Sequence, residues 1–207
     1  MLYTNTVEPN TLALLKQLMT IPELNDFYLV GGTCLSLRYG HRKSIDLDLF
    51  SVSPFENEVI VEAISKVLPL KVRNINNPVG IFGYIEDVKV DFVKQHRFPQ
   101  IGVPILEDGI RMFSDKDIMA MKVNAILKRA QKKDFWDVAE LLQHYTIKEF
   151  IINYEEKYPD QMLLISIPQA LTYFADAEES EDPISLKAQT WESVQKIIKQ
   201  NVSDYLS

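Results

Sequence analysis

Two aspartates separated by a single residue, Asp46 and Asp48, most constrain what this chain can fold into. They alternate with Leu47 and Leu49, which is the pattern of a β-strand with one buried face. Side chains alternate across a strand, so both carboxylates project from the same face, roughly 7 Å apart at their Cβ atoms. Like charges held in this way repel one another, and a hard cation such as Mg²⁺ relieves the repulsion. The pair therefore predicts a strand that binds metal.

A glycine turn precedes the aspartate strand. Gly31, Gly32 and Thr33 follow an apolar stretch at 28–30 and open a short predicted helix at 33–39. Glycine allows the backbone to approach an anion closely, and a helix N-terminus favours negative charge. The turn therefore suits phosphate binding, although two glycines on their own are more typical of an ordinary strand-to-helix turn.

A third carboxylate lies on a later stretch. Residues 87–93 alternate polar and apolar side chains, with Asp91 in the middle of the expected strand. An unpaired charge is normally unfavourable there. If this strand lies about 4.8 Å from the strand of Asp46 and Asp48, the three carboxylates form one cup. Such a cup suits two metal ions about 3.5–4 Å apart, the geometry of phosphoryl transfer.

These features together resemble the nucleotidyltransferase signature of the DNA polymerase β-like superfamily. The longer patterns are similar to those of the AbiEii/AbiGii-type toxin nucleotidyltransferases. They comprise residues 31–50 and a later series of charged residues: Lys122, Arg129, Lys133, Asp134 and Asp137. The resemblance covers about residues 25–145 and, more faintly, 171–178. Order, spacing and strand context give the signal its specificity, which a lone Gly-Gly or Asp-x-Asp lacks.

The resemblance implies metal-dependent transfer of a nucleoside monophosphate from a nucleoside triphosphate to an acceptor hydroxyl, with Mg²⁺ or Mn²⁺ as cofactor. The catalytic candidates are Asp46, Asp48, Asp91, Lys122 and Asp134, of which the first three are the expected metal ligands. The candidates for nucleotide binding are Gly31, Gly32, Thr33, Arg42, Ser44, Lys122, Arg129 and Lys133.

Several of these candidates have a structural alternative. Lys122 is expected to neutralise the triphosphate, but it also fits a position that merely flanks a buried helix stripe. Asp134 fits a helix N-cap as well as a substrate-site residue. Arg42 and Ser44 either fix the loop before the aspartate strand or contact phosphates.

The acceptor and the partners follow only from the resemblance. It implies an RNA acceptor, tRNA-like, and a cognate antitoxin. A small-molecule, antibiotic-type nucleotidyltransferase and a protein-modifying one would use the same strands. An inactive scaffold that only binds a partner is the non-enzymatic alternative, but it has no need of unpaired acids on a strand.

Composition excludes some other classes of protein. Cys34 is the single cysteine among 207 residues, which excludes an intramolecular disulfide. His41, His96 and His144 share no zinc-ligand spacing. The sequence contains neither a signal-peptide pattern nor a long apolar run, so we expect a cytoplasmic protein without a membrane segment.

The charge is unevenly distributed. The net charge is −7, and residues 151–207 carry ten Asp or Glu against four Lys. This acidity argues against non-specific binding of nucleic acid, and it offers a face to a basic partner. Five basic residues lie close together and form either a phosphate-facing surface or a solvated helix face: Lys122, Lys128, Arg129, Lys132 and Lys133.

The pattern predicts an α+β protein, a mixed sheet of about five strands with flanking helices followed by a helical C-terminal part. The resemblance implies that this sheet is polymerase β-like. We expect a nucleotidyltransferase core at 1–113 and a helical domain at 114–207 that contributes to the nucleotide and acceptor site. The expected strands are 27–31, 45–50, 71–76, 79–86 and 87–93, with a loop or short strand at 98–109. The expected helices are 8–19, 33–39, 53–67, 115–130, 134–144, 147–157, 161–174 and 188–202. Ser53-Pro54 and Ser114 to Asp117 are the expected helix starts, Pro168 an expected kink, and 175–183 an exposed linker.

Overall fold

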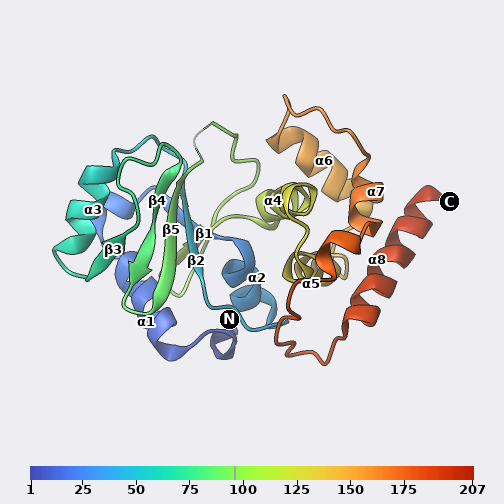
Figure 1. Cartoon of the computed structure of the whole chain (residues 1–207), viewed down its shortest axis with the longest axis horizontal. Coiled ribbons are helices and arrows are strands. Elements are labelled where there is room, and N and C mark those ends of the chain that lie inside the picture. The colour runs from blue at the N-terminus through green and yellow to red at the C-terminus, as the bar shows by residue number, and fades with distance from the viewer. Residues whose placement is uncertain (96) are drawn as a thin grey trace.

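Seven strands in the described part of the chain form one mixed sheet, which packs against a group of helices (Figure 1). The computed structural model describes residues 1–95 and 97–207. The order across the sheet is β3-β4-β5-β2-β1-β7-β6. The β2–β5 and β1–β7 pairs are parallel and the others antiparallel, so the predicted mixed sheet is confirmed. The strands are β1 (Phe27–Val30), β2 (Leu47–Ser51), β3 (Leu70–Val72), β4 (Gly80–Ile85), β5 (Val88–Lys94), β6 (Ile105–Glu107) and β7 (Ile110–Met112).

The prediction of about five strands is too low because β6 and β7 are short. Each has three residues, which is too few to show an alternating pattern. The turn between them uses Asp108 and Gly109, whose φ angles are 52° and 77°. Asp and Gly tolerate this left-handed region, so the chain reverses tightly there. The two strands extend the sheet beyond β1.

The helices follow the predicted periodicity more closely. They are α1 (Pro9–Leu18), α2 (Gly31–Tyr39), α3 (Asn57–Ser65), α4 (Asp115–Lys128), α5 (Lys132–Leu141), α6 (Ile147–Lys157), α7 (Ile167–Thr172) and α8 (Trp191–Leu206), with 3₁₀ turns at Thr4–Thr6, Pro22–Leu24 and Ala175–Ala177. The helix predicted at 147–157 has the predicted bounds. None of the helices in the described residues has both the length and the apolar character needed to cross a bilayer.

Several helix starts differ from the prediction, most of all those expected at 53 and 161. The helix expected from Ser53 begins instead at Asn57, because Phe55 packs its ring on Phe27 at 4.9 Å and holds the preceding residues outside the helix. Pro168 lies in the first turn of α7, after Ser166, whose hydroxyl accepts a hydrogen bond from the amide of Gln169. A proline in a first turn lacks a donor that the helix does not use, so it starts α7 and does not kink it.

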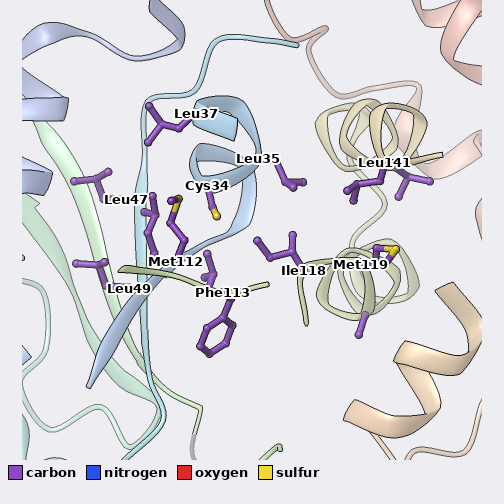
Figure 2. Close-up of a cluster of buried hydrophobic side chains, with 14 of the residues drawn as sticks. Cys34, Leu35, Leu37, Leu47, Leu49, Met112, Phe113, Ile118, Met119 and Leu141 are labelled. Atoms are coloured by element: carbon purple, nitrogen blue, oxygen red, sulfur yellow. The ribbon is translucent and has the colours of Figure 1, made fainter. Parts of the chain in front are cut away.

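Helix α2 joins the sheet to the C-terminal helices. Helices α1 and α3 lie on one side of the sheet, whereas α2 stands between its other side and α4 to α8 (Figure 1). Figure 2 shows the continuous apolar contact through α2, which includes Cys34, Leu35, Leu37, Leu47, Leu49, Met112, Phe113, Ile118, Met119 and Leu141. Burial raises the pKa of the Cys34 thiol to about 12. Trp136 and Trp191 are buried in the helical part and stack with their ring centroids 5.7 Å apart.

A buried ion pair fixes the start of α4. The Ser114 hydroxyl caps the Asp117 amide, but only this half of the predicted capping box forms. The Asp117 carboxylate instead accepts hydrogen bonds from the amides of Ile101 and Gly102 at 3.0 Å and from Lys157 Nζ at 2.8 Å. Asp117 and Lys157 are both fully buried. This carboxylate therefore ties α6 and the loop before β6 to α4.

We expect Asp117→Asn to destabilise the fold by about 3–5 kcal/mol, because it leaves the Lys157 ammonium buried without a counter-charge. Chemical unfolding measures the change. Glu62→Gln is the control, since it breaks the exposed pair of Glu62 with Lys66 and should shift the unfolding midpoint far less. Equal shifts of the unfolding midpoint in the two variants would show that the buried ion pair contributes no more to stability than the exposed one.

Candidate active site

Asp48 and Asp91 lie side by side on neighbouring strands. They are register partners in the parallel pair of β2 and β5. Residues at the same register of adjacent strands project from the same face, so the predicted proximity of these two carboxylates is confirmed. Asp46 stands one residue before β2.

The electrostatics at Asp48 show the cost of bringing these acids together. Burial raises the pKa of Asp48, and the charges of Asp91 and Asp46 raise it further. Lys89 and Lys122 act in the opposite direction without cancelling the rise. The ionised form of Asp48 is therefore destabilised in the protein alone, and an added cation would relieve it.

Asp91 has one free buried oxygen. Its Oδ2 accepts a hydrogen bond from Lys89 Nζ at 2.7 Å, whereas its Oδ1 is buried and meets no hydrogen-bond partner within the described residues. A buried acceptor without a partner is costly, and a cation would satisfy it. Carboxylate oxygens are also the ligands that Mg²⁺ prefers. The chemistry of Asp48 and Asp91 thus fits a divalent cation.

The third expected metal ligand is not brought into a cluster with the other two. Among residues 1–95 and 97–207, no three His, Cys, Asp or Glu side chains are arranged to hold a metal ion together. Register fixes Asp48 against Asp91, but it does not extend to Asp46. The role of Asp46 as a ligand stays a prediction.

Both glycines of the turn are required by close approaches. Gly31 has a φ of +70°, and a Cβ atom there would lie 2.8 Å from Asp48 Oδ2. A Cβ atom at Gly32 would lie 2.1 Å from Arg42 Nη2. Because Val30 pairs with Asp48, the N-terminus of α2 stands directly beside the carboxylates. This helix end favours an anion at the same place.

The hydroxyls of Thr33 and Ser44 are used within the protein. Thr33 is buried, its Oγ1 donates to the Asp46 carbonyl, and it lies 2.8 Å from Ser44 Oγ. These bonds fix the loop that carries Asp46. For Ser44, they favour the role of fixing this loop over the alternative role of contacting phosphates.

Arg42 makes a bidentate ion pair with Asp137 of α5. Its Nε lies 2.7 Å from Asp137 Oδ1, and its Nη2 lies 2.9 Å from Oδ2. His41 Nε2 also lies 2.7 Å from Asp137 Oδ1. All three side chains are buried. The guanidinium therefore anchors the loop before β2 to the helical part, which is the structural role predicted as one alternative.

Lys122 completes this group of charges. Its Nζ lies 2.6 Å from Asp137 Oδ2 and 2.9 Å from Asp134 Oδ1. Arg129 binds both oxygens of Asp134 at 3.1 Å. We call these five residues, Arg42, Lys122, Arg129, Asp134 and Asp137, the ion cluster. It contains three cations and two carboxylates.

The members of the ion cluster stay charged. Burial opposes ionisation of Asp137, but Arg42 and Lys122 outweigh it and hold its pKa well below the usual range. Burial likewise lowers the pKa of Lys122, yet Asp137 and Asp134 raise it overall. The pKa of Asp134 is lowered, because Lys122 and Arg129 outweigh its burial. The excess positive charge of the cluster reaches Asp48, because the charge of Lys122 lowers the pKa of Asp48.

The structure separates the predicted basic group. Lys122 is buried within the ion cluster, and Arg129 joins this cluster from an exposed position. Lys128 is exposed, and Lys132 pairs with Asp182 at 2.8 Å. Lys133 is half-buried in the first turn of α5. The five basic residues thus do not form a single phosphate-facing surface.

Sequence reasoning missed Asp137 as a functional candidate and mistook the position of Asp134. The cap of α5 is Gln131, so Asp134 is the third helical residue and not the N-cap. A signal for Asp137 existed: it lies four residues before Leu141, on the same buried face of α5, where an acid needs a buried partner. Of the histidines, His41 binds Asp137, His144 packs on the ring of Tyr39 at 4.9 Å, and His96 lies outside the described residues.

Comparison with known proteins identifies the family. The sequence model of the family described as "Nucleotidyl transferase AbiEii toxin, Type IV TA system" matches residues 13–196. The chain belongs to the AbiEii nucleotidyltransferase toxin family. Nucleotidyl transfer is therefore the activity that its site serves.

Known proteins of similar sequence or structure match nearly the whole chain. The uncharacterized protein aq_aa25 of Aquifex aeolicus is 34% identical over 199 residues, 93% of this chain and 94% of that protein. The crystal structure of JHP933 from Helicobacter pylori has a TM-score of 0.60 at 16% identity and covers 95% of this chain and 92% of its own. MenT4, a nucleotidyltransferase toxin of Mycobacterium tuberculosis, has a TM-score of 0.55 at 16% identity over 93% of this chain and 84% of its own. These two structures have the same fold.

We expect Asp137→Asn to destabilise the protein by about 3–5 kcal/mol at pH 7, because it leaves Arg42 and Lys122 buried without their shared carboxylate. The pKa of Asp137 is lowered in the folded protein, so its contribution is complete above about pH 4 and is lost as the pH falls further. The difference between wild type and variant should therefore shrink below about pH 4. Urea unfolding as a function of pH measures it.

Asp160→Asn is the control for this experiment, since Asp160 is an exposed acid of the same helical part. It should leave the pH profile unchanged. A constant difference between wild type and Asp137→Asn from pH 7 to pH 2 would contradict the assigned ionisation of Asp137.

Proposed function

We propose that this AbiEii-family protein is a metal-dependent nucleotidyltransferase that moves a nucleoside monophosphate from a nucleoside triphosphate to an acceptor hydroxyl. The observation that carries the proposal is the pairing of Asp48 with Asp91 beside the Gly31 turn. The free Oδ1 atom of Asp91 and the raised pKa of Asp48 both call for a bound cation at this place.

Asp48 and Asp91, with Asp46, would hold two Mg²⁺ or Mn²⁺ ions. When bound, such ions neutralise charge on the triphosphate and make the acceptor hydroxyl more acidic. The amides at the N-terminus of α2, at Gly31, Gly32 and Thr33, would bind the β- and γ-phosphates. These groups orient the α-phosphorus toward the acceptor.

The transfer itself is a single displacement. The acceptor oxygen bonds to the α-phosphorus in line, the bond between the α-phosphorus and its bridging oxygen breaks, and pyrophosphate leaves. Asp91, beside the acceptor hydroxyl, would help to take its proton.

The remaining candidates would act around this centre. Arg129 is half-exposed through its side chain, and Lys133 is half-buried, so both would reach a bound nucleotide. Lys122 and Asp134 would position the site through the ion cluster, with Lys122 adding positive charge near the phosphates. In this proposal, residues 1–113 hold the catalytic strands and residues 114–207 complete the nucleotide and acceptor site.

The proposed acceptor is RNA with a tRNA-like end, and the proposed setting is toxin activity in the cytoplasm under control of a cognate antitoxin. The family description names a type IV toxin–antitoxin system, which supports the toxin and antitoxin parts. We further propose a role in defence against phage, from the abortive-infection members of the family. The acidic region at 151–207 would suit a basic partner.

We expect Asp48→Asn to lower the transfer rate on the order of a thousandfold, because a two-metal site would lose several kcal/mol of transition-state stabilisation with one carboxylate. Stability without metal should hold or rise, because the pKa of Asp48 is raised and its ionised form is unfavourable in the folded protein. Thermal melts with and without Mg²⁺ and nucleotide separate the two effects, since ligand should stabilise wild type much more than the variant.

Asp87→Asn is the matched control, because Asp87 is an exposed acid just before β5. It should transfer nucleotide at the wild-type rate. If Asp48→Asn unfolds the protein, or retains near wild-type transfer, the catalytic assignment of Asp48 is wrong.

Labelling identifies the acceptor. The protein is incubated with each α-³²P-labelled nucleoside triphosphate and Mg²⁺, together with total RNA, protein lysate or a small-molecule extract. We expect label in RNA and none with Asp48→Asn. Label in protein or in small molecules would replace the proposed acceptor, and no label in any fraction would support an inactive scaffold.

A further inference from the structure

Lys89 lies beside the carboxylates although no catalytic motif includes it. It stands two residues before Asp91 on β5, so the two side chains share a face of the sheet. Lys89 Nζ binds Asp91 Oδ2 at 2.7 Å. The lysine side chain is 35% exposed, whereas that of Asp91 is 12% exposed. The ammonium therefore reaches into the site from its solvent side.

The charge of Lys89 opposes a bound metal. Asp46 and Asp48, as well as Asp91, lie close enough to stabilise its ammonium. In the metal-free protein, the ammonium of Lys89 is thus a counter-charge for these carboxylates. A divalent ion on Asp91 would be repelled by an ammonium bound to the same carboxylate. A cation on the partnerless Oδ1 atom would therefore weaken the bond of Lys89 to Oδ2.

The freed ammonium has a suitable second partner. Lysine is a mobile point charge on a flexible stem, and its partly exposed position leaves it room to move. The phosphates of a nucleotide bound at the N-terminus of α2 would bring new negative charge beside the same strands. An ion pair with a phosphate would there replace the ion pair that the ammonium loses at Asp91.

We propose that Lys89 is a displaceable counter-ion that pairs with Asp91 in the free protein and moves to a substrate phosphate when metal takes the carboxylate. The inference rests on the proposed function and adds a nucleotide-binding residue to it. Lys89 weakens the binding of metal alone and strengthens the binding of nucleotide in the presence of metal. It thereby couples the two binding events.

Binding measurements test the inference without turnover. Mn²⁺ is titrated by electron paramagnetic resonance, and each of the four α,β-methylene ribonucleoside triphosphates is titrated in turn with Mn²⁺ present. We expect Lys89→Gln to bind Mn²⁺ alone about threefold to fivefold more tightly, as for loss of a partly exposed ion pair. It should bind the preferred triphosphate about threefold to fivefold less tightly. Lys89→Arg keeps the charge and should resemble wild type in the Mn²⁺ titration.

Lys94→Gln is the matched control, because Lys94 lies on the same strand but its ammonium sits over the ring of Phe55. It removes the same charge and should change neither affinity. Thermal melts of all variants establish that they are folded. Equal Mn²⁺ affinity of Lys89→Gln and Lys94→Gln, or an unchanged triphosphate affinity of Lys89→Gln, overturns the inference.

Asp48→Asn distinguishes this failure from failure of the proposed function. If wild type binds Mn²⁺ and Asp48→Asn does not, the metal site stands and the Lys89 variants alone decide the inference. If Asp48→Asn binds Mn²⁺ as tightly as wild type, the proposed metal site is wrong and the counter-ion role of Lys89 falls with it.

Discussion

The buried carboxylate of Asp137 holds the two parts of this structure together at the site. It belongs to a helix of the C-terminal part, yet it binds Arg42 and His41 from the loop that leads to the aspartate strand. Lys122 reaches the same carboxylate from α4. A buried ion pair is weak support for stability in general, because desolvation offsets much of the attraction. Its directional bonds nevertheless fix the loop before Asp46 in one place.

The ion cluster and the carboxylate pair are complementary in charge. Asp48 and Asp91 bring two acids together at one register, a like-charge contact that a fold selected only for stability would avoid. The cations of Lys89 and Lys122 moderate this repulsion from opposite parts of the molecule, one on β5 and the other on α4. In the proposed function, this remaining excess of negative charge is what a bound cation would neutralise.

The glycine turn shows how tightly these groups are packed. A single Cβ atom at Gly31 would meet the carboxylate of Asp48, and one at Gly32 would meet the guanidinium of Arg42. The turn therefore does more than permit a left-handed backbone: it lets α2 start against both the carboxylates and the ion cluster. Apolar contacts of α2 with the sheet and with α4 and α5 then keep that helix end in place (Figure 2).

The sequence by itself determined the main strands, most helices and the face on which Asp48 and Asp91 project, because period-two and helical patterns are local properties. Its motifs also indicated the family. It left the range that contains β6 as a loop or short strand and missed β7, because three residues are too few to show a period. It also placed a helix start at Ser53 that the packing of Phe55 moves to Asn57. Only the tertiary structure showed which partners the charged motif residues meet, because a charge has no intrinsic partner. The sequence left Arg42, Lys122 and Asp134 open as substrate contacts or as structural residues, and the fold joins them through buried ion pairs that local patterns do not reveal.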